Sequence, residues 1–174
     1  LLVALLAAFA SSSSSSSART TQAATVVLCK PSASVSRWLE LPSVSGPAVP
    51  LRLASHPTQC TIAGSGSLRL GACGGAPAFR LVPSKRYPMR GYNLVEFNET
   101  SGVATGSCVD AKGLVAAQLY KCLDSANQGW NVNVSTGAIR ETFDRRGSVL
   151  GLSTDPACVA AKPAPGPAPT PKPA

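Results

Sequence analysis

Aromatic residues, charged residues and histidine are scarce in this sequence. Aromatics make up 5% and charged residues 14% of the 174 residues, and there is a single histidine. Much of the 44% hydrophobic fraction is alanine, so the chain has material for one domain with tails rather than for two sizeable cores. No window repeats its apolar residues with a helical period, while 15 glycines and 15 prolines indicate many turns. These features argue against long helices.

Metal and nucleic-acid binding are not expected. None of the cysteines forms a C-x-x-C pair and His56 is the only histidine, so no zinc site and no other cofactor is predicted. The formal net charge is +8, and the densest basic cluster contains Arg80, Lys85, Arg86 and Arg90. Such a cluster can contact nucleic acid or an acidic polymer, but no aromatic-rich basic motif accompanies it. We therefore interpret the cluster as a solvated loop.

The two ends of the chain have compositions typical of targeting and linker segments. Residues 1–24 begin with the apolar run LLVALLAAFA and continue with seven serines, which predicts a partial signal peptide and a disordered Ser-rich linker. The apolar run covers about ten residues, too few to span a bilayer, so no membrane span is expected. A membrane anchor that is truncated at its start is the alternative. Residues 161–174 are rich in proline and predict an extended linker.

Between these ends the pattern is that of a small all-β domain. From residue 49 onward, apolar runs of four to seven residues alternate with Gly, Ser, Asn and Pro turns, and many runs alternate apolar with polar residues. Earlier in the chain, TVVLC at 25–29 has the β-branched residues of a strand, and Trp38 and Leu39 suggest another short one. The predicted domain covers residues 25–160.

An internal repeat is the strongest architectural signal. The pair Cys60 and Cys73 recurs as Cys108 and Cys122, 48 and 49 residues later, with a turn-rich loop and an apolar strand inside each pair. The repeat predicts the disulfides Cys60–Cys73 and Cys108–Cys122, each worth roughly 3 kcal/mol on the chain-entropy estimate. Cys29 and Cys158 are left over, and a bond between the two ends of the domain is one pairing open to them. Disulfides and a signal peptide together predict a secreted, extracellular or cell-wall protein.

The best-preserved unit lies at 108–130 and reads CVDAKGLVAAQLYKCLDSANQGW. Its Cys-Val-Asp start, Gln-Leu-aromatic-x-Cys middle and Asn-Gln-x-Trp end resemble the ricin-B-type lectin module, whose QxW repeats build a β-trefoil. The good match covers 108–150, and a degraded match reaches back to about 49. A third unit begins near 147–150, lacks the cysteine and soon reaches the proline-rich tail. The resemblance therefore implies a β-trefoil-like fold whose third repeat is incomplete or degenerate.

The resemblance also implies one carbohydrate site, for galactose or N-acetylgalactosamine glycans. Asp110 would accept hydrogen bonds from sugar hydroxyls, Tyr120 would stack on the apolar face of the sugar, and Asn127 would supply a donor and an acceptor. Gln118 lies one strand alternation from Tyr120 and so faces the same side, where it too would contact the sugar. Gln128 would brace the Asp110 carboxylate.

Each of these residues also has a plainer interpretation. Asp110 alone fits a cap on the Lys112-Gly113 turn, and Tyr120 alone fits half-buried packing. Trp130 is assigned to the core, as in the family. The first repeat has Ile62 at the aspartate position and the third has Gly151 there, so one site at most is predicted. A single shallow site implies millimolar affinity, roughly −4 kcal/mol.

The remaining signals are two glycosylation sequons and four scattered carboxylates. Asn98-Glu99-Thr100 and Asn133-Val134-Ser135 are N-x-[ST] sequons, so Asn98 and Asn133 are candidate glycosylation sites.

Asp110, Asp124, Glu96 and Glu141 are the candidates for a glycosidase pair, but their spacing favours no two of them. We expect no enzyme in this region, although a linked glycosidase domain is compatible with it. A structural or protein-binding trefoil without sugar binding is the remaining alternative.

Overall fold

The computed structural model describes residues 24–30, 37–88, 91–113, 116–143, 148–152 and 158. The predicted signal segment and Ser-rich linker up to residue 23, the Pro-rich linker at 161–174 and Arg90 of the basic cluster lie outside these ranges. Within the described ranges, no helix has the length and apolarity that a membrane crossing requires.

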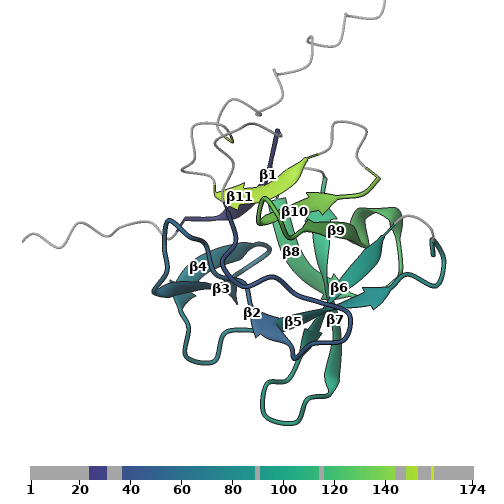
Figure 1. Cartoon of the computed structure of the whole chain (residues 1–174), viewed down its shortest axis with the longest axis horizontal. Coiled ribbons are helices and arrows are strands. Elements are labelled where there is room, and N and C mark those ends of the chain that lie inside the picture. The colour runs from purple at the N-terminus through teal and green to yellow at the C-terminus, as the bar shows by residue number, and fades with distance from the viewer. Residues whose placement is uncertain are drawn as a thin grey trace, which may run out of the picture.

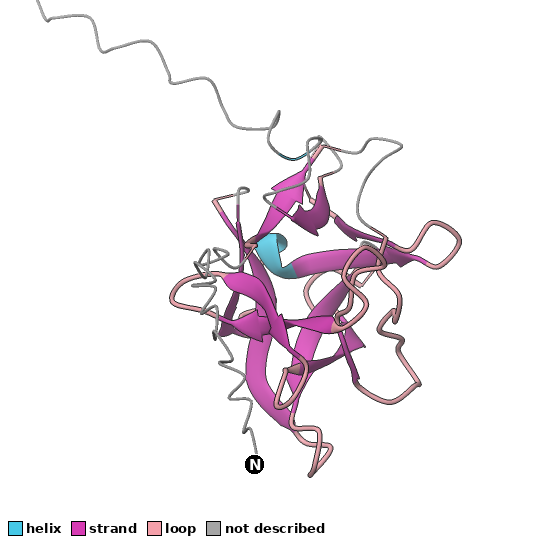
Figure 2. Ribbon diagram, turned by 90° about the vertical axis from the view of Figure 1, so that its left-hand side faces the viewer, coloured by secondary structure: helices cyan, strands magenta, loops and turns pink. Residues whose placement is uncertain are grey.

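The described chain is all-β, as its short alternating runs predict (Figure 1). One short 3-10 helix, η1 (Ala126–Gln128), interrupts the strands, and it stands out in cyan in Figure 2. The strands are β1 (Val26–Cys29), β2 (Val49–Pro50), β3 (Gln59–Ala63), β4 (Leu68–Ala72), β5 (Ala78–Pro83), β6 (Tyr92–Phe97), β7 (Ala104–Lys112), β8 (Ala116–Lys121), β9 (Gly129–Asn133), β10 (Ala138–Glu141) and β11 (Val149–Leu152).

Seven of these strands close into a barrel. They follow one another in the order β6-β7-β8-β1-β11-β10-β9, and β9 returns to β6 through the pairs Tyr92↔Trp130 and Asn93↔Gly129. Strands β5 and β2 extend the sheet from β6, and β3 and β4 form a separate antiparallel hairpin. Closure gives each of the seven strands at least two neighbours, so none of the seven has the kind of open edge that favours aggregation.

The barrel is completed by strands from opposite ends of the domain. Strand β11 pairs with β1 from Val26↔Leu152 to Cys29↔Val149, and β1 also meets β8 at Val27↔Ala116. The unit that begins near residue 149, which looks unfinished in the sequence, therefore finds its partner strand at the start of the domain. A scan for repeats in chain order does not reveal this pairing, because the partner lies upstream.

The core is built from inward-facing aliphatic side chains and a few large rings. Trp38, Phe79 and Trp130 are all buried. Each indole N–H has a partner, since Trp130 Nε1 donates to the Val109 carbonyl at 2.8 Å and Trp38 Nε1 donates to the Leu150 carbonyl at 3.3 Å. The assignment of Trp130 to the core is confirmed, and its indole links β9 to β7.

Three disulfide bonds cross-link the domain. The two predicted pairs, Cys60–Cys73 and Cys108–Cys122, are bonded, at sequence separations of 13 and 14. The two remaining cysteines, Cys29 and Cys158, also form a bond, at a separation of 129. Three disulfides are compatible with an extracellular protein.

Loop length predicts how much each disulfide stabilises the fold. We expect Cys29→Ala/Cys158→Ala to lower the free energy of unfolding by about 4–5 kcal/mol and Cys108→Ala/Cys122→Ala by about 3 kcal/mol, because the longer loop restricts the unfolded chain more. Urea titration of each double variant against the parent protein measures both values. An equal or larger loss from the 108–122 pair would contradict this ranking.

Candidate functional site

Strands β7 and β8 separate the core from a polar surface. In their register Asp110 lies opposite Gln118 and Cys108 lies opposite Tyr120, so these four residues share one face of the pair. The alternate residues, such as the fully buried Val109, face the core. The two strands thus bring together three of the predicted site residues.

The Asp110 carboxylate is the centre of a side-chain network. Its Oδ1 accepts a hydrogen bond from Gln118 Nε2 at 3.3 Å, and its Oδ2 accepts bonds from Asn127 Nδ2 at 2.7 Å and Gln128 Nε2 at 3.2 Å. Asp110 is only 4% exposed. Among the described residues its donors are all side chains, and none belongs to the Lys112-Gly113 turn.

Gln128 fixes this network to the backbone. It is fully buried, its Nε2 also donates to the Lys121 carbonyl at 2.9 Å, and its Oε1 accepts from the Leu123 N–H at 2.8 Å. Its neighbour Asn127, also in η1, accepts from Ser125 Oγ at 2.6 Å. The short helix therefore holds both amides against the end of β8, where Gln128 bonds the Asp110 carboxylate that it is expected to brace.

Tyr120 is the exposed member of the group. Its side chain is 52% exposed, at the end of β8 and on the same strand face as Gln118. A ring that is half in solvent can stack on a flat apolar surface and keep its hydroxyl hydrated. The structure thus combines an oriented carboxylate, three amides and an accessible ring.

The equivalent positions in the other units lack this chemistry. In the β3–β4 hairpin, Ile62 lies opposite Arg69 and Cys60 lies opposite Gly71. A Cβ atom on Gly71 would come within 2.3 Å of Ile62 Cδ1, so a ring there requires Ile62 to move. In the sequence repeat Gly151 falls at the aspartate position, and in the structure it lies on β11 opposite Val27 of β1. Neither pair supplies a carboxylate in these registers.

Asp124 has a role that sequence reasoning missed. It lies between β8 and η1 at a φ of 52°, where its Oδ1 accepts from Asn93 Nδ2 at 2.8 Å and its Oδ2 from the Arg86 N–H at 2.7 Å. Partial burial raises the pKa of Asp124, but hydrogen bonds from Asn93, Ser84 and the Arg86 and Lys85 backbone outweigh it, so the pKa lies below its ordinary value. The carboxylate ties the 84–87 loop to the loop that leads into the site.

Two arginines of the basic cluster, Arg80 and Arg86, contact aromatic rings of the same chain. The guanidinium of Arg80 lies 4.1 Å from the centre of the Phe97 ring, and that of Arg86 lies 5.5 Å from the centre of the Tyr87 ring. Both cations therefore stack on rings of the same molecule.

The other carboxylates and the histidine have local partners. Glu96 accepts a hydrogen bond from Thr105 Oγ1 at 2.6 Å, and the buried Glu141 accepts from the Phe143 N–H at 3.0 Å. In an exposed turn, Ser55 Oγ lies 3.0 Å from His56 Nδ1, a contact that the sequence pattern does not predict. No acceptor carboxylate is bonded to this ring within the described part of the chain.

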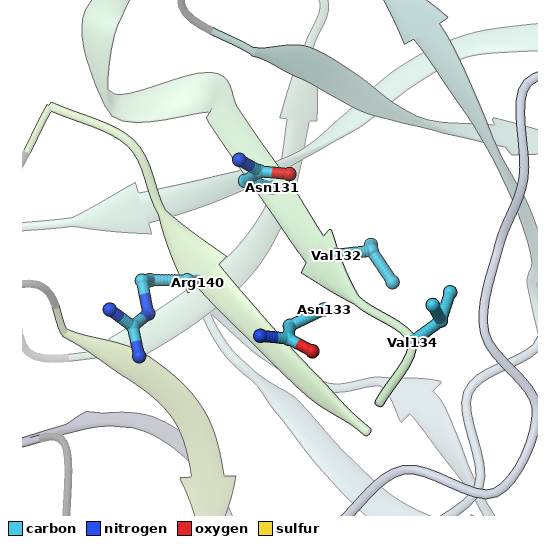
Figure 3. A pocket seen from close by; sticks show the side chains of 5 residues that line it. All are labelled: Asn131, Val132, Asn133, Val134 and Arg140. Atoms are coloured by element: carbon cyan, nitrogen blue, oxygen red, sulfur yellow. The ribbon is translucent and has the colours of Figure 1, made fainter. Parts of the chain in front are cut away.

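Two surface hollows adjoin the predicted glycosylation sites. One, of about 640 Å³, lies between the β3–β4 hairpin and the loop after β6, and Phe97 and Asn98 help to line it. The other, of about 390 Å³, lies on the β9–β10 hairpin and is lined by Asn131, Val132, Asn133, Val134 and Arg140 (Figure 3).

Known proteins give no independent identification. No family model matches the chain, and no curated protein and no solved structure matches it either. The function must therefore be inferred from the geometry above.

The buried amide of Gln128 should matter more for stability than the peripheral amide of Gln118. We expect Gln128→Leu to lower the free energy of unfolding by about 3 kcal/mol, because the Asp110 carboxylate, the Lys121 carbonyl and the Leu123 N–H each lose a partner. Gln118→Leu is the matched control and should cost under about 1 kcal/mol, since it removes one long contact. Urea denaturation measures both, and equal losses would contradict the network.

The lowered pKa of Asp124 predicts a stability difference that depends on pH. A depressed pKa in the folded state contributes stability above the unfolded pKa, and this contribution is lost as the pH falls through the folded pKa. The stability difference between the parent protein and Asp124→Asn should therefore be largest above about pH 4 and shrink toward zero below it. Denaturation curves between pH 2.5 and 6 measure it. Glu99→Gln is the control, and a pH-independent difference for Asp124→Asn would contradict this account.

Proposed function

We propose that this chain is a secreted carbohydrate-binding module of the ricin-B type, with one weak site for galactose or N-acetylgalactosamine glycans around Asp110. The observation that carries the proposal is the joint placement of the Asp110 carboxylate, the amides of Gln118, Asn127 and Gln128, and the half-exposed ring of Tyr120. Sugar recognition needs this combination of rigid polar groups and a flat apolar surface.

The hydrogen-bond arrangement sets how a sugar would engage Asp110. A carboxylate offers about four acceptor positions, and three are already used. One hydroxyl could take the remaining position. A second could replace the Gln118 donor, whose 3.3 Å contact is the longest of the three. Gln118 would then be released to bond the same sugar.

The hydrogen bonds from the Asn127 and Gln128 amides fix the orientation of the Asp110 carboxylate. Asn127 and Gln128 both bond Oδ2, so Oδ1 is the oxygen with capacity left for a ligand. Asn127 is itself engaged by Ser125 and Asp110, and it would reach the sugar with its second N–H. The affinity expected from so few contacts is millimolar, about −4 kcal/mol. Useful avidity would come from linked modules or further copies.

A β-trefoil is the arrangement of the barrel that we propose. Three antiparallel strand pairs, β3–β4, β7–β8 and β11–β1, would be its three equivalent hairpins, with the last built from both ends of the domain. Two equivalent bonds support this: the Trp130 indole donates to the β7 carbonyl of Val109, and the Trp38 indole donates to the β11 carbonyl of Leu150. Phe79 would take the corresponding core position of the remaining unit.

Glycosylation at Asn98 and Asn133 is part of the same proposal. Both residues are exposed and lie at turns. Asn98 Oδ1 accepts from the Thr100 and Ser101 N–H groups, and Asn133 Oδ1 accepts from Ser135 and Thr136. Both turns are therefore held by the carbonyl oxygen, which leaves the amide nitrogen, the atom that takes the glycan, pointing away from these bonds.

Two variants at Tyr120 test the lectin proposal without disturbing the buried network. We expect the parent protein to bind galactose- or N-acetylgalactosamine-terminated glycans, and Tyr120→Ala to bind five- to tenfold more weakly because it loses the stacking surface, about 1–1.4 kcal/mol. Tyr120→Phe keeps the ring and should bind within about twofold of the parent. A glycan array followed by NMR titration with the best sugar gives these values.

Two outcomes would remove the proposed site. One is the absence of glycan binding by the parent protein, which would favour a structural or protein-binding role. The other is sugar binding that Tyr120→Ala and Asp110→Ala leave unchanged, which would place recognition elsewhere. Hydrolysis of labelled oligosaccharides would instead favour the glycosidase alternative.

A further inference from the structure

The outer face of the β9–β10 hairpin carries a group of hydrogen-bond donors that the Asp110 site does not use. In the strand register Arg140 lies directly opposite Asn131, and Asn133 lies two residues farther along β9. The alternate residue Ile139 is fully buried, so Arg140, Asn131 and Asn133 point to the solvent side. Figure 3 shows Asn131 and Asn133 spaced along β9 and Arg140 on the neighbouring β10, with Val132 and Val134 along the other side of β9, and all five line one hollow.

In the part of the chain that the structure describes, the side-chain N–H donors of Arg140, Asn131 and Asn133 have no hydrogen-bond acceptor. Among the described residues, Arg140 has no ion-pair partner and the Asn131 carboxamide has no hydrogen bond. Asn133 uses its Oδ1 to hold the turn through Ser135 and Thr136, which presents its Nδ2 as a donor. A guanidinium and two amide N–H₂ groups thus border one hollow of about 390 Å³, and no carboxylate lines it within the described chain.

A set of donors around one cation selects an anion. The planar guanidinium bonds carboxylates and sulfates through two parallel N–H groups, and amides beside it can bond the adjacent hydroxyls of a sugar. Val132 and Val134 add apolar surface at the rim. Arg37 packs beside Gly137 in the turn of the same hairpin, where it lines a neighbouring hollow. The formal net charge of +8 further favours an anionic partner.

We propose that this hollow is a second saccharide site, specific for an anionic sugar, in which Arg140 bonds the carboxylate or sulfate ester and Asn131 and Asn133 bond neighbouring hydroxyls. It is independent of the Asp110 site, because the two lie on different strand pairs and use different chemistry. A glycan attached to Asn133 Nδ2 would occupy the same hollow, so the site belongs to the form of the protein that is unmodified at Asn133.

Two variants separate modification of Asn133 from its part in binding. Ser135→Ala removes the sequon and keeps Asn133. Asn133→Asp also removes it and keeps the Oδ1 acceptor that holds the turn, but places a negative charge in the hollow. We expect the Ser135→Ala protein to bind oligogalacturonate, and the Asn133→Asp protein to bind it at least tenfold more weakly because like charges repel.

The decisive comparison uses the Ser135→Ala protein and isothermal titration with oligogalacturonate, its neutral methyl ester and a sulfated galactan oligomer. Arg140→Ala should weaken binding of the anionic ligand at least tenfold, Arg140→Lys should weaken it less, and the methyl ester should not bind. Lys30→Ala removes an exposed charge elsewhere and should change binding by less than twofold. The two anionic oligomers distinguish a carboxylate from a sulfate as the recognised group.

Three outcomes would overturn this proposal. They are an Arg140→Ala protein that binds the anionic oligomers within twofold of its parent, equal binding of the methyl ester, or no binding of either anionic oligomer. Tyr120→Ala should leave this binding unchanged. The Tyr120 variant tests the Asp110 site and the Arg140 variants test this hollow, so the failure of one proposal can be distinguished from the failure of the other.

Discussion

The pairing of β1 with β11 is the constraint on which the rest of the structure depends. It closes the barrel, and the Cys29–Cys158 disulfide fastens the same two ends of the domain. Because β1 also borders β8, it supports the strand that carries Gln118 and Tyr120. A change at the end of the domain can therefore reach the candidate site through two strand contacts, without touching any of its polar residues.

The candidate site is itself organised by a nearly buried charge. An unpartnered carboxylate with 4% exposure would be costly, and the amides of Gln118, Asn127 and Gln128 offset that cost while fixing the direction of its lone pairs. The Cys108–Cys122 disulfide and the Asp124 anchor hold the loop that brings η1 against β8. Rigidity of this kind lowers the entropy lost on binding, which matters most for a small, weak ligand site.

Sequence patterns predicted the local features well. The all-β class follows from short alternating runs, and the two close disulfides follow from the repeat of cysteine spacing. The placement of Gln118 and Tyr120 on one strand face follows from the alternation of side chains along a strand, because residues two apart point to the same side. These features depend on neighbours in the chain, so periodicity and spacing carry the information.

Features that depend on distant segments could not be predicted in this way. The partner of β11 lies more than a hundred residues upstream, and no spacing rule links the two. Asp124 bonds Asn93 across 31 residues, and the extent of Asp110 burial depends on how η1 folds back. The Arg140 hollow likewise depends on the β9–β10 register and on the absence of a nearby carboxylate among the described residues, and both are properties of the folded structure.

The position of β1 has a consequence for how this protein is made. During synthesis β1 emerges long before β11, with about 120 residues between them, so the barrel has no complete form until the last strand has left the ribosome. Such a long-range contact makes closure slow compared with the hairpins, which can form on their own. Until then β1 and β10 each keep an open edge, and the chain is most exposed to misassembly and to mispaired cysteines at that stage.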